Sequence, residues 1–198
     1  MDGMARLSGA RIGPNAITRV AVAMRAARGE DATRVLFDAA GLAHHLDHPP
    51  EHMVAEGDVV ALHAALRASV QDWRSIARDA GRRTGEYLLA NRIPRPVQFM
   101  LRLLPARLAA RILSGAIARH AWTFAGSGSF AAHPGRPTAL VIEGCPLARG
   151  AAAAEPVCDC YAATFERVFG ALVHRRATAT EIACAATGAP ACRFSIGW

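Results

Sequence analysis

The amino-acid sequence predicts an α+β fold, an antiparallel sheet with helices packed on one face. Over the first two thirds of the chain, apolar residues recur at the spacing of helix faces. In the remainder, short β-type segments and turns surround one further amphipathic stretch. We expect a helical N-terminal region at residues 1–95 and a second region at 96–198, together in one compact domain.

The composition limits the classes of protein to consider. A chain of 198 residues is long enough for one domain with a sizeable core. Its formal charge is +7, and all 23 of its basic residues are arginine. The arginines are spread along the chain and no helix-turn-helix stands out, so we do not expect nucleic acid as the partner. Arginine pairs well with carboxylates, although a GC-rich genome also explains the composition.

The sequence favours a cytoplasmic protein. Its five cysteines, an odd number, fit a reducing compartment better than a disulfide framework. The first eight residues have no apolar core of a secretory signal. Arginines interrupt every apolar run before it reaches the ~20 residues of a membrane span, so we expect no transmembrane segment.

Helical periodicity divides the first region into several elements. We expect helices at 15–28 and 31–40, each ended by a glycine, and a long helix from 58 to about 80. The glycines of 81–85 are expected to interrupt that helix. The prolines at 93–96 end the helical stretch that follows.

The second region begins with helices and continues with strands. We expect helices at 97–104 and 105–122 and a buried strand at 140–142. The sequence Gly126-Ser-Gly-Ser-Phe-Ala131 formally fits a dinucleotide fingerprint, but that motif requires a preceding strand and a helix opening at its last glycine. Neither context is expected here, so we reject a nucleotide site.

Four of the five cysteines lie in the last forty-one residues and suggest a metal site. Cys158 precedes a helix expected at 159–174, where the helix dipole favours a thiolate. Strands expected at 178–186 and 191–198 form a hairpin that brings Cys184 and Cys192 together. With either Glu181 or Cys160 as fourth ligand, these residues would form a closed structural zinc site.

Two points oppose this interpretation. Glu181 and Cys184 are an odd number of residues apart, so a regular strand would place them on opposite faces. A bulge or strand end near Ala183 is needed to bring both to one ion. The alternative is a set of small, buried, reduced thiols. We expect an ordinary thiol at Cys145.

Histidines also gather in the first region. His44, His45, His48 and His52 lie close together in a proline-containing segment. We interpret this group as a solvated loop because the spacing fixes no geometry.

The motif Glu181-x-x-Cys184, with Gly188 and Cys192-x-Phe194 after it and Cys158 ahead of the helix, resembles the 4-vinyl-reductase domain family. The segments 11–19 and 126–130 resemble more closely the members of this family that act in bacteriochlorophyll biosynthesis. The resemblance covers nearly the whole chain and rests on few residues between about Glu30 and Arg95.

The resemblance implies a fold, an assembly and a ligand set. The fold is the ligand-binding, vesicle-tethering (TRAPP Bet3-like) fold, and members commonly form homodimers. Region 96–198 then becomes the small-molecule-binding core of the 4-vinyl-reductase type. In related phenol sensors three cysteines and one glutamate hold zinc, which corresponds here to Cys158, Glu181, Cys184 and Cys192. This favours Glu181 and leaves Cys160 as the alternative ligand.

The resemblance also implies a ligand, a magnesium tetrapyrrole of the Mg-protoporphyrin or divinyl protochlorophyllide type. We expect a carrier or chaperone that passes it between enzymes such as magnesium chelatase and the next methyltransferase or cyclase, at the cytoplasmic side of the photosynthetic membrane. His120, Trp122 and Phe124 are the candidate tetrapyrrole-binding residues, with the imidazole as an axial ligand. The alternatives are reduction of the 8-vinyl (4-vinyl) group of a chlorophyllide precursor and small-molecule sensing.

We expect a carrier more than an enzyme. Hydride transfer needs a cofactor, and no cofactor site or catalytic residue can be recognised in the sequence. A closed zinc site leaves no position open for a substrate.

Overall fold

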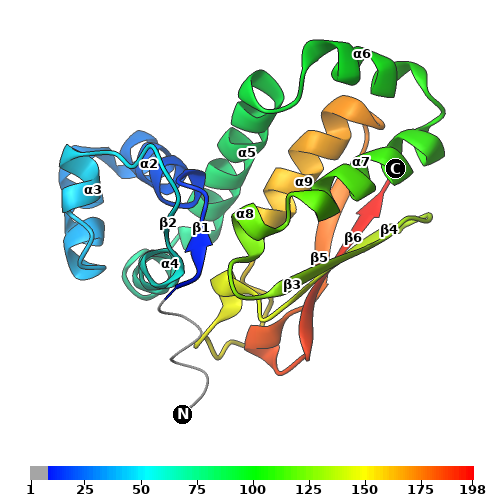
Figure 1. The fold of residues 1–198 in the computed structure, drawn as a ribbon. Coiled ribbons are helices and arrows are strands. Elements are labelled where there is room, and N and C mark those ends of the chain that lie inside the picture. The colour runs from blue at the N-terminus through cyan, green and yellow to red at the C-terminus, as the bar shows by residue number, and fades with distance from the viewer. Residues whose placement is uncertain (1–8) are drawn as a thin grey trace.

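A four-stranded antiparallel sheet forms one side of the protein, which was analysed as a computed structural model describing residues 9–198 (Figure 1). The strand order is β3 (Ser129–His133), β4 (Thr138–Glu143), β6 (Ala191–Gly197) and β5 (Thr178–Ala183). Leu140, Ile142, Phe194 and Ile196 alternate along the two central strands and are fully buried. One face of the sheet therefore belongs to the core.

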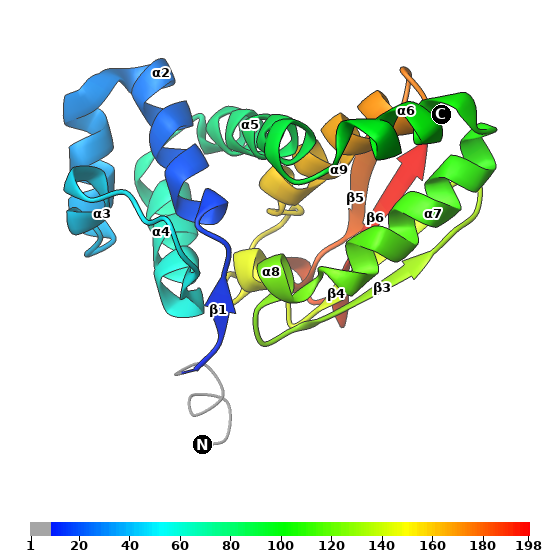
Figure 2. The ribbon, with the colours of Figure 1, turned by 45° about the horizontal axis from the view of Figure 1, so that its top comes forward.

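Helices cover that buried face. Figure 2 shows α9 (Asp159–Leu172) and α7 (Ala106–Arg119) on the same side of the sheet, with α6 (Arg95–Leu103) near its upper end. Phe165 and Phe169 of α9 are buried between helix and sheet. The predicted α+β fold, an antiparallel sheet with helices packed against it, is confirmed.

The N-terminal part is helical, as expected, and adds a layer behind α9. It contains α2 (Asn15–Ala39), α3 (His44–Asp47), α4 (Glu56–Ser69) and α5 (Trp73–Asn91). Gly29, with φ +84°, kinks α2 at the point where the sequence predicted one helix to end. Two short strands, β1 (Arg11–Ile12) and β2 (Val54–Ala55), form a second, two-stranded antiparallel sheet that was not predicted.

Two predictions about the long helix were wrong. The chain leaves the helical conformation at Val70, whose backbone is extended, so the predicted helix is the separate helices α4 and α5. The predicted interruption at 81–85 is absent, and α5 continues through both glycines. A Cβ at Gly81 would lie 2.1 Å from the carbonyl oxygen of Cys160, and one at Gly85 would lie 2.7 Å from Cβ of Arg167. The glycines therefore allow α5 to pack directly on α9.

The glycine-rich segment after α8 (Trp122–Ala125) serves packing and turn formation. Gly126 has φ +58°, and a Cβ there would lie 2.8 Å from Cδ of the fully buried Glu56. The backbone N–H of Ser127 donates to Glu56 Oε2 at 3.0 Å, and Arg149 forms an ion pair with the same carboxylate. The segment follows a helix and leads into β3, so it lacks the strand-turn-helix context of a dinucleotide site.

The last segments differ slightly from the expected boundaries. β5 ends at Ala183, earlier than predicted, and is followed by the short 3-10 helix η2 (Ala185–Thr187) and by Gly188 at φ +91°. A second such helix, η1 (Pro146–Ala148), follows β4. Within residues 9–198, every helix is too short or too polar to cross a bilayer. The predicted absence of a signal sequence concerns residues 1–8, which lie outside the described part.

Candidate functional site

Three cysteines and one glutamate from separate elements meet at one end of α9. Cys158 is the N-cap residue of α9, Glu181 lies in β5, Cys184 follows β5 and Cys192 lies in β6. Their ligand atoms all lie within 4.8 Å of one another. These are the four residues to which the family resemblance assigned the zinc. We call them the cysteine cluster.

A β-bulge makes this arrangement possible. Glu181 is paired with Phe194 and Ala183 with Arg193, so the register of β5 against β6 shifts between Glu181 and Ala183. The shift lies where a regular strand would have sent Glu181 and Cys184 to opposite faces. The hairpin then places Cys184 and Cys192 with their Sγ atoms 3.8 Å apart.

The distances between the sulfur atoms suit a tetrahedral metal ion. Cys158 Sγ lies 4.0 Å from Cys184 Sγ and 3.6 Å from Cys192 Sγ. Zn–S bonds of about 2.3 Å in a tetrahedron give sulfur–sulfur distances of roughly 3.8 Å. All three thiols are fully buried, so an ion held here would be closed off from solvent, as at structural zinc sites.

The carboxylate of Glu181 has one satisfied and one unsatisfied oxygen. Oε2 accepts a hydrogen bond of 2.8 Å from the backbone N–H of Cys158. Oε1 is buried and has no hydrogen-bond partner among the described residues. Burial raises the pKa of Glu181 to about 7. A buried acceptor without a partner is expensive, and a cation beside it would remove that cost.

The close contact of the thiols points the same way. The contact with Cys145, followed by those with Cys184 and Cys192, raises the pKa of Cys158 well above its ordinary value. A metal ion would stabilise the thiolates that these neighbours disfavour. The donor set therefore fits zinc.

Cys145 is a neighbour that the sequence analysis missed. Its Sγ lies 3.6 Å from Cys158 Sγ, although an ordinary thiol away from the site was expected. The turn at Gly144, with φ +61°, carries the chain from β4 toward the cluster. The spacing of thirteen residues from Cys158 gave no signal, because the contact depends on how β4 and α9 pack.

Cys160, the alternative ligand, does not join the group. It lies in the first turn of α9 and is buried, and burial raises its pKa to about 12. The cluster contains Glu181 in its place.

The histidine group does not assemble into a site. Among residues 9–198, the cysteine cluster is the only set of three or more possible ligands that comes together. His44 and His45 lie in α3 with ring centroids 4.0 Å apart, and His45 Nε2 is 3.7 Å from a carboxylate oxygen of Asp58. His63, expected at the boundary of its helix, is instead buried.

The three candidate tetrapyrrole-binding residues lie at the end of α7 and in α8. His120 is exposed, and the side chain of Trp122 is 61% exposed. The ring of Phe124 is half-buried and packs edge-on against Phe130, with centroids 5.3 Å apart. Phe124 thus contributes to the aromatic core beside the sheet, whereas the other two face solvent.

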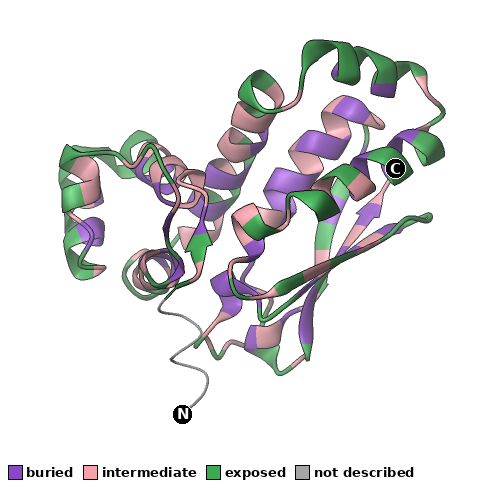
Figure 3. Ribbon diagram, in the orientation of Figure 1, coloured by how far each residue is buried: buried purple, intermediate pink, exposed green. Residues whose placement is uncertain are grey.

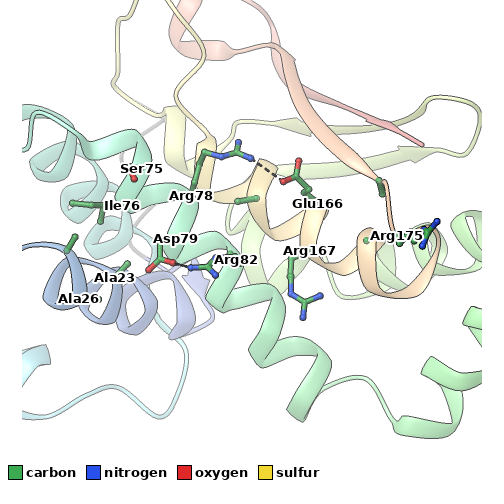
Figure 4. A pocket seen from close by; sticks show the side chains of 14 residues that line it. Ala23, Ala26, Ser75, Ile76, Arg78, Asp79, Arg82, Glu166, Arg167 and Arg175 are labelled. Carbon is green, nitrogen blue, oxygen red and sulfur yellow. Dashed lines mark hydrogen bonds and ion pairs between the residues drawn. The ribbon is translucent and has the colours of Figure 1, made fainter.

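A second feature is an open hollow of about 930 Å³ between α2, α5 and α9. Figure 4 shows arginine side chains around it, with Arg78 directed to Glu166 and Arg82 to Asp79. The four arginines and two acids leave an excess of two positive charges. Small residues line much of the rest: Ala23, Ala26, Ala27, Ala163, Gly170 and Ala177. The sequence analysis could not select these arginines, because three helices distant in sequence contribute to the hollow.

Comparison with known proteins identifies relatives along almost the full length. Residues 138–198, which include the whole cysteine cluster, match the 4-vinyl-reductase domain. A protein of Cereibacter sphaeroides named bacteriochlorophyll synthase 23 kDa chain is 44% identical over 94% of this chain and 90% of its own length. The protein of the same name from Rhodobacter capsulatus is 39% identical over 93% of this chain and 85% of its own. The predicted resemblance to the bacteriochlorophyll-biosynthesis branch, BchJ, of the 4-vinyl-reductase domain family is confirmed.

Proposed function

Because the chain belongs to the family of the bacteriochlorophyll synthase 23 kDa chain, we propose that it takes part in bacteriochlorophyll biosynthesis as a carrier of a magnesium tetrapyrrole. The ligand would be of the magnesium protoporphyrin or divinyl protochlorophyllide type. The carrier would pass it between pathway enzymes, such as magnesium chelatase and the methyltransferase or cyclase that follows. The observation that carries this proposal is the arginine-lined hollow between α2, α5 and α9.

The hollow has the chemistry that such a ligand requires. A tetrapyrrole intermediate presents a flat apolar ring and carboxylate side groups. The small residues of α2 and α9 would let a ring approach the helix backbones closely, and the volume lies in the range of small-molecule sites. Arginine forks bind carboxylates in a bidentate manner.

The charges of the hollow favour an acidic guest. Arg175 forms no ion pair among the described residues, and Arg78 is held by Glu166 at 3.3 Å. A carboxylate entering the hollow can pair with Arg175 without displacing an internal partner. It can also share Arg78 with Glu166, because one guanidinium has five N–H donors.

We propose a structural zinc ion in the cysteine cluster. When bound, zinc would hold the start of α9 against the β5–β6 hairpin through Cys158, Cys184, Cys192 and Glu181. A site with four protein ligands and no exposed sulfur serves stability and leaves no place for a substrate. Because α9 also lines the hollow, this brace would fix one of the hollow's walls.

The test is a titration of purified protein of known metal content with magnesium protoporphyrin and divinyl protochlorophyllide, followed by fluorescence. We expect saturable binding. The double variant Arg78→Gln, Arg175→Gln should weaken it by at least about tenfold, because hydrogen bonds to charged groups contribute roughly 1.5–3 kcal/mol each. Arg34→Gln, at an exposed arginine outside the hollow, is the matched control.

Two outcomes would contradict the proposal. If His120→Ala with Trp122→Ala abolishes binding while the arginine variant binds normally, the ligand occupies the end of α7 instead. If the pure protein reduces the vinyl group after addition of a nicotinamide donor, measured as a blue shift of the ligand's absorption, it is a reductase and the carrier role is wrong.

A further inference from the structure

The excess positive charge of the chain lies in one segment. No aspartate or glutamate occurs between Glu86 and Glu143, whereas seven arginines lie there. This number equals the formal charge of the whole chain, +7. Among the described residues, none of the seven forms an ion pair: Arg92, Arg95, Arg102, Arg107, Arg111, Arg119 and Arg136.

The exposed apolar side chains gather in the same segment. Of the nine large hydrophobic residues that are exposed in the described part, seven lie between Val97 and Trp122. Figure 3 shows α6 largely in the colour of exposed residues. The seven are Val97, Phe99, Met100, Leu103, Leu108, Ile112 and Trp122.

Helix α6 presents its apolar side outward. Phe99, Met100 and Leu103 follow the spacing of one helix face and are 64%, 44% and 69% exposed. The polar Gln98 is instead buried, and its side-chain amide donates to the backbone carbonyl oxygens of Leu89 and Ile93. A surface helix normally has the opposite arrangement, and these hydrogen bonds hold α6 in this orientation.

Helix α7 extends the surface beyond the bend at Pro105. Leu108 and Ile112 lie one turn apart and are both exposed, next to the exposed Arg107 and Arg111. The inner side of α7 carries Ala109 and Leu113 into the core. We call the exposed residues Phe99, Met100, Leu103, Leu108 and Ile112, with Arg95, Arg102, Arg107 and Arg111, the α6–α7 face.

We infer that the α6–α7 face docks on an anionic lipid surface. Apolar side chains enter the boundary between headgroups and acyl chains, and arginines reach the lipid phosphates with their stems in apolar surroundings. Within residues 9–198 no helix can cross a bilayer, so the helices would lie along the membrane plane. Charge selects this partner over a second copy of the chain, because two acid-free, arginine-rich faces would repel each other.

This inference is independent of the tetrapyrrole proposal. The α6–α7 face shares no residue with the arginine-lined hollow. Loss of one activity by mutation should therefore leave the other intact.

The test is co-flotation of the purified, full-length protein with vesicles. One set contains phosphatidylcholine alone, and the other contains phosphatidylcholine with about a third of phosphatidylglycerol. We expect binding to the anionic vesicles, with at least tenfold weaker binding to the neutral ones. The binding should also weaken steeply with added salt, because each arginine near the surface contributes about fivefold in affinity.

Two variants examine the two components of the face. Phe99→Asp with Leu103→Asp should reduce the vesicle affinity by at least about tenfold, because it removes two inserting side chains and adds negative charge. Arg107→Gln with Arg111→Gln should reduce it by roughly 25-fold. The controls Val35→Asp and Arg34→Gln change an exposed apolar residue and an exposed arginine on α2, and should bind normally.

The contrary results are equally definite. Equal binding of wild type and both double variants, or no binding to anionic vesicles at all, would overturn the inference. A dimer in light scattering that Phe99→Asp with Leu103→Asp converts to a monomer, without vesicle binding, would mean that the face joins two copies. Circular dichroism and metal content confirm that the variants fold.

Discussion

The cysteines and the histidines of this chain are both concentrated in short stretches, yet only the cysteines form a site among the described residues. Cys158, Cys184 and Cys192 come from the start of a helix, the end of a strand and the next strand. His44 and His45 come from one short helix, and His48 and His52 from the irregular chain that follows it. The cysteines are fully buried, while His48 and His52 are exposed.

The difference shows what proximity in sequence can establish. Residues on separate packed elements converge only if the core that holds those elements is correct, so their convergence is specific. Residues along one exposed segment are near each other in any conformation, and their nearness carries little information about a metal.

The largest expected effect comes from removing one cysteine of the cluster. Cys184→Ser should abolish stoichiometric metal binding and lower the free energy of unfolding by about 4 kcal/mol, the stabilisation from a ligand at a thousand times its dissociation constant. Elemental analysis and urea unfolding measure the two effects. The histidine group supplies the control: replacing His44, His45, His48 and His52 by asparagine should leave the bound metal unchanged. A full equivalent of zinc retained by Cys184→Ser would remove that residue from the ligand set.

A buried histidine sharpens the comparison, because its imidazole lacks what the cysteines have. His63 Nε2 is buried without a hydrogen-bond partner in the described structure. Burial lowers its pKa to about 3, Arg67 acts in the same direction and the backbone of Ala16 opposes them.

His63 should therefore destabilise the fold in acid. The folded pKa lies below the unfolded value of 6.5, so the unfolded state binds the proton more readily. Stability is complete above pH 6.5 and falls by roughly 1.4 kcal/mol per pH unit toward pH 3. Unfolding of wild type and His63→Leu, compared from pH 4 to 8, should show a shallower acid decline in the variant. Parallel curves would mean that His63 does not titrate as its burial implies.

The smallest expected effect concerns Cys145, which touches the cluster without completing it. Cys145→Ser should keep one equivalent of metal and lose about 1 kcal/mol, the usual scale for one buried hydrogen bond. With cobalt in place of zinc, the intensity of the sulfur-to-metal charge-transfer absorption should equal that of wild type. Cys160→Ser, at the buried cysteine outside the cluster, is the matched control. A weaker absorption in Cys145→Ser alone would make Cys145 a ligand.

The sequence predicted those features that depend on local pattern. The helices of the first half and the hairpin carrying Cys184 and Cys192 follow from periodicity and turn residues, and the need for a bulge near Ala183 follows from the two-residue repeat of a strand. The choice of Glu181 over Cys160 required the family resemblance.

The remaining features depend on packing between distant segments. Gly81 and Gly85 resemble helix breakers until α9 is placed against them. The contact of Cys145 with Cys158 and the buried pair of Glu56 and Arg149 join residues that no spacing rule connects. The arginine-lined hollow needs three helices in place before it exists.

Helix α9 has a consequence for how the two proposed ligands would influence each other. It starts at Cys158 in the cysteine cluster, and Ala163, Glu166 and Arg167, one to three turns later, line the hollow. Because α5 packs on α9 through Gly81 and Gly85, a displacement of α9 changes two walls of the hollow at once. If metal binding fixes this helix, thermodynamic reciprocity requires that a guest in the hollow change the affinity for the metal by the same factor as the metal changes the affinity for the guest.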